Sequence, residues 1–334
     1  MAGLKNKFYG KDRKAGRLSY LFSSNVLQTI IIGYFCDMKN TCLHIAAILL
    51  CLCSCDQVGN LSDLSEEQQE ELSSITFKYD VNLWKTERML EPGDNAGIFA
   101  GSPVNADNLL ASVSQDGTLQ CSQPVRWDLT KKVSSITFAA YSPYSGAYQT
   151  GSGTFTVMED QSTEAAVKAS DLVVASLRLT SRENQITFSF SHKMVRLALY
   201  FDNRSGSDIE SVTVSGVSAS TSVNLAKGEV SLSTSVTTSI KAGQYVSSES
   251  ETYYSVLIAP QKARPSIRVN MKDGTYKTFV LDSQITFDAG NQWDNENDPL
   301  VIDTTSDPGK EEPVEFSLSI NDWNNGGSMD FVKQ

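Results

Sequence analysis

The chain has 334 residues, with 28 Lys and Arg against 39 Asp and Glu and a formal net charge of −11. An acidic surface repels phosphate backbones, so this composition argues against a nucleic-acid partner. The length is better suited to two domains than to one.

A short apolar run near the N-terminus, residues 43–52, leads to a cysteine that follows a small residue. This arrangement resembles a bacterial lipoprotein signal, in which a peptidase cuts before a cysteine that carries lipid. Cys55 meets the requirement because Ser54 precedes it, whereas Cys51 and Cys53 both follow leucine. We expect cleavage between Ser54 and Cys55 and a lipid on Cys55. The alternative is an ordinary secretory signal, and in both cases the rest of the chain leaves the cytoplasm.

The segment that precedes this signal makes the N-terminus longer than a signal peptide requires. A second apolar stretch, residues 26–35, is too short to span a bilayer. We therefore expect translation to start at Met38, which leaves residues 38–54 as the signal and 1–37 as an untranslated extension. The alternative is a genuine long basic leader.

Residues 55–72 are polar and acidic and are predicted to tether the lipid to the first domain, with a helical turn starting at Asp63 or Ser65. Of the six cysteines, only Cys55 and Cys121 follow the signal. If Cys55 carries lipid, Cys121 has no partner within the chain, so no disulfide is expected.

From Ser73 onward, apolar residues alternate with polar ones, as in half-buried strands. The triplet Ile-Thr-Phe occurs four times at unequal intervals, which indicates strand chemistry without a sequence repeat. Asp116-Gly117 and Asp273-Gly274 predict hairpin turns in which both residues have positive φ. Short strands with frequent turns predict an all-β chain of antiparallel sandwiches, 73–168 and 169–334, divided near a polar stretch at 160–171.

Candidate catalytic and metal-binding residues are few. His192 is the one histidine after the signal and is predicted to be structural, which argues against a Ser-His-Asp enzyme and a histidine-rich metal site. Asp294, Glu296 and Asp298 alternate like calcium ligands, but Pro299 stands where such a loop needs glycine. We expect no enzyme activity, no cofactor and no metal. The four tryptophans, predicted to pack in cores, are Trp84, Trp127, Trp293 and Trp323.

Several segments, taken in order, resemble fimbrillin-like proteins, the subunits of type V pili. The resemblance covers roughly residues 73–327. The segments are Gly93-Asp94-Asn95-Ala96-Gly97-Ile98-Phe99, Ala140-Tyr141-Ser142-Pro143-Tyr144, Ser170-Asp171-Leu172-Val173-Val174-Ala175, Phe188-Ser189-Phe190-Ser191-His192, Tyr254 to Gln261, Phe287-Asp288-Ala289-Gly290-Asn291-Gln292-Trp293 and Ile320-Asn321-Asp322-Trp323-Asn324. The chain departs from the family pattern after Trp293, where residues 294–299 interrupt the expected strand.

The resemblance implies two tandem transthyretin-like sandwiches, a lipoprotein precursor held in the outer membrane through Cys55, and assembly with other pilus subunits by strand exchange. In the family, a protease that cuts after arginine removes the first strand, and a neighbour's C-terminal strand replaces it. Mapped here, the removable strand is Ile75 to Val81, the processing residue is Arg88 and the candidate donor is Val314 to Ile320.

Two functions stay open. The first is a structural or adhesive component of a pilus at the cell surface, as stalk, tip or anchor, with a host or glycan ligand. The second is a lipid-anchored glycan-binding protein of a polysaccharide uptake system, which would expose coplanar tryptophans.

Overall fold

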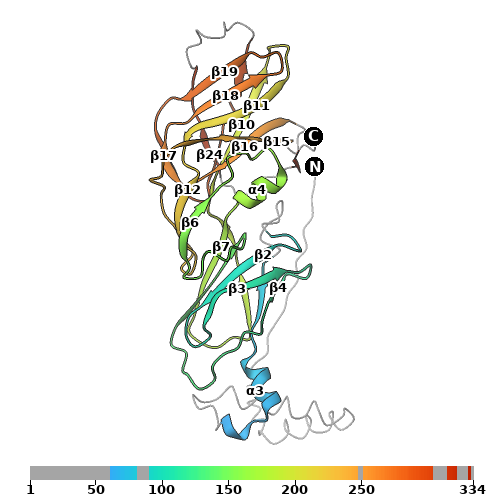
Figure 1. The fold of residues 1–334 in the computed structure, drawn as a ribbon, viewed down its shortest axis with the longest axis vertical. Coiled ribbons are helices and arrows are strands. Elements are labelled where there is room, and N and C mark those ends of the chain that lie inside the picture. Colours follow the sequence, from blue (N-terminus) through green and yellow to red (C-terminus); the bar gives the residue numbers. More distant parts are fainter. Residues whose placement is uncertain (1–60, 81–89, 247–250, 304–313, 322–329, 332–334) are drawn as a thin grey trace, which may run out of the picture. The chain divides into compact units, whose positions relative to one another are not determined.

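The computed structural model describes residues 61–80, 90–246, 251–303, 314–321 and 330–331 (Figure 1). The short 3₁₀ helix η1, Leu61–Asp63, belongs to an N-terminal unit. The residues from Leu64 onward form a second unit, in which two α-helices are described, α3 at Glu66–Ser73 and α4 at Glu164–Ser170. Strands make up most of the rest, so the prediction of a mostly β chain is confirmed.

Among the described residues, eight strands form the first sheet, in the order β8-β1-β4-β3-β2-β5-β7-β9. Strands β7 to β9 follow residue 169, so strands on both sides of the predicted domain division share this sheet. The strands are β1 Thr76–Tyr79, β2 Asn95–Ala100, β3 Ala106–Val113, β4 Thr118–Cys121, β5 Ile136–Ser142, β7 Val173–Leu179, β8 Gln185–Phe188 and β9 Ser191–His192.

The other strands in the described part of the chain form four further sheets. The seven-stranded sheet contains β10 Val195–Asn203, β15 Gly243–Val246, β16 Thr252–Ile258, β21 Gln292–Asp294, β22 Leu300–Ile302, β24 Ser319–Asn321 and β25 Asp330–Phe331. The five-stranded sheet contains β11 Ile209–Val217, β14 Thr238–Lys241, β18 Ser266–Met271, β19 Tyr276–Leu281 and β23 Val314–Phe316. The smaller sheets contain β6 Ser152–Thr156, β12 Ser220–Asn224 and β13 Glu229–Val230, and β17 Gln261–Ala263 with β20 Ile285–Phe287.

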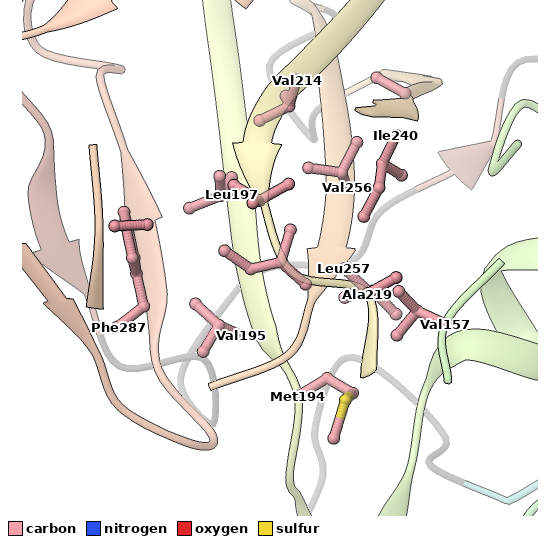
Figure 2. Packing of buried hydrophobic residues seen from close by; sticks show 14 of the residues in the cluster. Val157, Met194, Val195, Leu197, Val214, Ala219, Ile240, Val256, Leu257 and Phe287 are labelled. Carbon is pink, nitrogen blue, oxygen red and sulfur yellow. The ribbon is translucent and has the colours of Figure 1, made fainter. Parts of the chain in front are cut away.

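Two main apolar cores are buried between these sheets. One consists of residues from the first part of the chain, between Ile75 and Phe190. The other runs from Phe99 to Phe316 and contains the inward side chains of β10, β11 and β16. Figure 2 shows Leu197, Val214 and Val256 pointing into this second core. Alternation of apolar residues is what buries one face of each strand in such cores.

Both predicted Asp-Gly turns form hairpins, β3 to β4 and β18 to β19, but their geometry differs from the prediction. Only the glycine of each pair has positive φ, +81° at Gly117 and +88° at Gly274. The N–H of Gly117 donates to the carbonyl of Ser114, and Thr118 N–H donates to the Asp116 side chain. The aspartate is thus held by its own side-chain acceptor, and positive φ is needed at the glycine alone.

The interruption after Trp293 is bridged by one side chain. Strands β21 and β22 both run parallel to β10, with a gap opposite Tyr200. Buried Asn295 fills this gap: its Oδ1 accepts the N–H of Tyr200 at 2.9 Å, and its Nδ2 donates to the Tyr200 carbonyl at 2.9 Å. A primary amide can replace a strand residue because it presents one donor and one acceptor in the same plane.

Candidate functional site

Strand β1 lies inside the first sheet, between β4 and β8. It is antiparallel to β4, where Phe77 pairs with Leu119, and parallel to β8, where Phe77 pairs with Ile186. An internal strand uses its backbone groups on both sides, so removing it would open two strand edges at once. The prediction of a strand over Ile75 to Val81 is confirmed for Thr76–Tyr79, and Val81 lies outside the described residues.

Backbone hydrogen bonds hold β1 at both ends. Near its start, Ile75 N–H donates to the Val125 carbonyl at 2.9 Å, and Thr76 N–H donates to the Asn184 carbonyl at 2.8 Å. Near its end, Tyr79 N–H donates to the Gly117 carbonyl at 2.9 Å, and Asp80 N–H donates to the Phe188 carbonyl at 3.0 Å. These bonds extend the pairing of this segment with its neighbours over residues 75–80.

The side chains of this strand divide cleanly between the two faces. Ile75, Phe77 and Tyr79 are buried, while Thr76 is exposed and Lys78 is half-buried. The ring of Phe77 stacks on Phe188, with centroids 5.7 Å apart, and lies against Phe138 at 6.0 Å. Offset aromatic pairs at these distances add to the apolar burial.

Helix α3 leads into β1 and shares its neighbours. Ser65 caps the helix by accepting the Gln68 N–H, which confirms the helix start predicted there, although the helix continues for two turns. Glu70 forms an ion pair with Arg126, and the Asn184 side chain donates to the Glu71 carbonyl at 2.9 Å. The helix and β1 therefore contact the same two loop segments, one at residues 125–126 and the other at Asn184.

The connection between β1 and β2 contains the predicted processing residue. Arg88 lies outside the described residues, as do Ser54 and Cys55. On the far side of this connection, Leu90 is buried at 1% exposure. Lys168 of α4 forms ion pairs with Glu91 at 2.7 Å and Asp94 at 2.8 Å. The chain is thus held by packing and hydrogen bonds on each side of residues 81–89.

The candidate donor, Val314 to Ile320, is not one strand as predicted. Its first half is β23, parallel to β19, and its second half is β24, antiparallel to β21 in a different sheet. The prediction of a single strand is wrong because the two halves pair with different neighbours. Both β23 and β24 lie at the edge of their sheets. The side chain of Phe316 in β23 is buried, whereas that of Ile320 in β24 is 55% exposed.

The sequence profile of the fimbrillin-like family matches residues 85–323. The chain belongs to the fimbrillin-like family. No curated protein shows significant sequence similarity to it.

Two solved structures share the fold of this fimbrillin-like protein. A proposed cell adhesion protein from Bacteroides uniformis has a TM-score of 0.55 at 18% identity, covering 75% of this chain and 98% of its own. A proposed cell adhesion protein from Bacteroides ovatus has a TM-score of 0.54 at 20% identity, covering 78% of this chain and 98% of its own. The family is not enzymatic, so this fimbrillin-like protein is not an enzyme.

Three of the family-like segments meet at a cavity of about 250 Å³, which sequence reasoning did not foresee. Gly93 to Asn95, Ser142 to Tyr144 and Asp171 line it, together with Lys168. Desolvation alone would lower the pKa of Lys168, but hydrogen bonds to Asp94 and Glu91 outweigh it and raise that pKa. The three segments thus come together in space, where the start of β2, the end of β5 and the end of α4 meet.

The other residues singled out from the sequence have packing roles where they are described. His192 is buried, with Nδ1 2.8 Å from Asp171 Oδ1. Trp127 is 2% exposed and donates Nε1–H to the Glu183 carbonyl, and Trp293 is half-buried. Trp84 and Trp323 lie outside the described residues.

Within the described ranges, no three His, Cys, Asp or Glu side chains gather in a metal-binding group. Among those same residues, no helix has the length and apolar character needed to cross a membrane. Cys121 has a free thiol in β4. Burial raises its pKa from 9.0 to about 11, which keeps it in the unreactive thiol form.

Proposed function

We propose that this fimbrillin-like protein is a cell-surface pilus subunit that assembles by strand exchange. The observation that carries the proposal is the position of β1. It is internal to its sheet, its apolar side chains fill a buried row, and it joins the rest of the fold through one connection, residues 81–89. Losing such a strand leaves a groove with free backbone groups on two sides, which favours capture of a strand from another chain.

The maturation route follows from the N-terminal sequence. The precursor carries lipid on Cys55, is held in the outer membrane, and presents its folded part at the cell surface. A protease then cuts after Arg88, which releases residues 55–88 together with β1. Burial of Leu90 and the ion pairs of Glu91 and Asp94 with Lys168 would keep the new N-terminus in place.

The two-domain organisation also remains part of the proposal. The core between Ile75 and Phe190 would be that of the first transthyretin-like sandwich, and the larger core that of the second. The groove of β1 belongs to the first domain and β23 and β24 belong to the second, so acceptor and donor lie in different domains.

N-terminal sequencing of protein sheared from the cell surface tests the proposed processing. We expect a start at Met89 in polymer and a start at Cys55 in the membrane-bound precursor. The variant Arg88→Ala should leave only the precursor, while Lys85→Ala, in the same connection, should be processed normally. If surface polymer starts at Cys55, strand loss is not how this protein assembles.

A further inference from the structure

We infer that a cavity of about 330 Å³ beside the first sheet binds one sugar unit of an uncharged glycan. The end of β2 and the starts of β3 and β5 line one side of this cavity, and residues 149–150 and Ala226 line the other. These three strands remain in the sheet when β1 is removed, so the inference goes beyond the proposed strand exchange and does not depend on it. The volume is at the small end of the range of about 300–1,000 Å³ that is usual for ligand pockets.

The cavity lies where one face of the first sheet leaves the larger core. Ala139 and Tyr141 of β5 are 0% exposed, whereas Thr137, which points to the same face, is exposed. Phe99 of β2 pairs with Ala139, is 5% exposed and lines the cavity. Its ring stacks on Tyr141 with centroids 5.9 Å apart. The buried face thus opens at Thr137, next to a fixed aromatic ring.

The opposite wall is held in place by backbone contacts. The N–H of Leu225 donates to the Gly151 carbonyl at 2.6 Å. Gly151 has a φ of +76°, and a Cβ at this position would lie 2.5 Å from the Cβ of Ala226, so the close approach requires glycine. The loop that contains Gln149 and Thr150 is therefore fixed against the turn between β12 and β13. A preformed wall lowers the entropic cost of binding a ligand.

The side chains that line the cavity have unused hydrogen-bonding capacity. Within the described residues, the structure gives no hydrogen-bond partner to the side chains of Asp107, Thr137 and Thr150. Gln149 donates Nε2–H to the Gly146 carbonyl at 3.1 Å, which leaves its Oε1 as an acceptor. A carboxylate and an amide oxygen accept hydrogen bonds, and a hydroxyl both donates and accepts them. This set complements the neighbouring hydroxyl groups of a sugar ring.

The charge of the lining favours an uncharged ligand. Among the described residues that line the cavity, Asp107 alone is charged, so it would repel a sulfate, phosphate or carboxylate group. The guanidinium of Arg178, which is opposite Thr137 in β7, donates to the Ser135 hydroxyl and does not line the cavity. A neutral sugar is therefore better suited to this cavity than an acidic one.

A peptide is a poorer match, because the strands around the cavity have no open edge. Strand β2 lies between β3 and β5, and β5 lies between β2 and β7. Their backbone groups are paired within the sheet, so an added peptide could not extend it here. Contact with Phe99 would instead remove the apolar face of a sugar ring from water.

Binding of the full, uncut chain to an array of neutral and acidic oligosaccharides tests the class of ligand. We expect binding to neutral glycans that share a terminal sugar. The substitution Asp107→Asn should weaken this binding at least about tenfold, because it replaces a charged acceptor with a neutral one. The control Glu210→Gln, at an exposed position in β11, should leave binding unchanged.

The substitution Thr137→Trp tests the location. An aromatic side chain is tolerated at an exposed strand position, so it should fill the cavity and abolish binding while the urea unfolding midpoint stays the same. The control Thr187→Trp, exposed in β8, should bind normally. If Thr137→Trp lowers the midpoint, the result for Asp107→Asn decides.

Three results would each overturn the inference: binding to no glycan, preference for acidic glycans, or full binding by both Thr137→Trp and Asp107→Asn. None of them would bear on strand exchange, which N-terminal sequencing of surface polymer tests separately. Conversely, a surface polymer that starts at Cys55 would overturn strand exchange and leave the sugar site standing.

Discussion

The substitution Phe77→Ala tests how strongly the first strand is held. The ring is 1% exposed and lies between Phe138 and Phe188, both fully buried. Truncating a buried phenylalanine removes its transfer free energy and leaves a cavity, which together cost about 3–5 kcal/mol. Rigid aromatic neighbours cannot collapse into the space, so we expect about 4 kcal/mol in the free energy of unfolding of the uncut chain.

Urea unfolding of the uncut protein, followed by tryptophan fluorescence, measures this loss. The matched control is Thr76→Ala on the exposed face of the same strand, which should change the free energy of unfolding by less than about 0.5 kcal/mol. A loss below about 1 kcal/mol for Phe77→Ala would contradict the packing described for β1. The groove would then offer too little apolar burial to capture a partner strand.

Three further substitutions test other parts of the structure. Gly97→Ala would place a methyl group 2.6 Å from Asn108 Oδ1 and against the ring of Tyr141, whose hydroxyl is fixed by Asn108 and Ser145, so we expect a loss of about 2–3 kcal/mol by urea unfolding. An unchanged unfolding midpoint would contradict this close approach. Asn295→Ala removes the hydrogen bonds to the N–H and carbonyl of Tyr200 and should lower the free energy of unfolding by about 3 kcal/mol. The control Asn297→Ala, at an exposed position, should leave it unchanged. Equal effects of the two substitutions would refute the bridging role. Burial raises the pKa of Cys121 to about 11, so the folded state favours the thiol form. The free energy of unfolding, compared with that of Cys121→Ser, should therefore fall as pH rises from about 9 to 11. A difference between the two proteins that does not change with pH would refute this prediction.

Local patterns predicted much of the β structure because alternation directly reports a half-buried strand. Each of the four Ile-Thr-Phe triplets contributes to a strand, β1, β5, β8 or β20. Unequal spacing excluded a repeat, yet Phe77 of one triplet packs against Phe138 and Phe188 of two others. The triplets are residue types that favour strands, so the strands themselves could be predicted. The contacts between their phenylalanine rings depend on the order of strands in the sheet, which no local pattern encodes.

The remaining differences also have non-local causes. Strand β10 lacks alternation because it is buried on both faces, so its pattern resembles any apolar run. The cavity beside Lys168 draws on three segments far apart in the sequence. Residues 314–320 alternate perfectly but divide between β19 and β21, because available neighbours decide pairing.

The strand between β4 and β8 in assembled polymer tests the central claim most directly. A cryo-electron microscopy map of surface filaments would show which residues fill this position. We predict residues 314–320 of an adjacent subunit. Density for Thr76–Tyr79 of the same chain in that position would contradict the account.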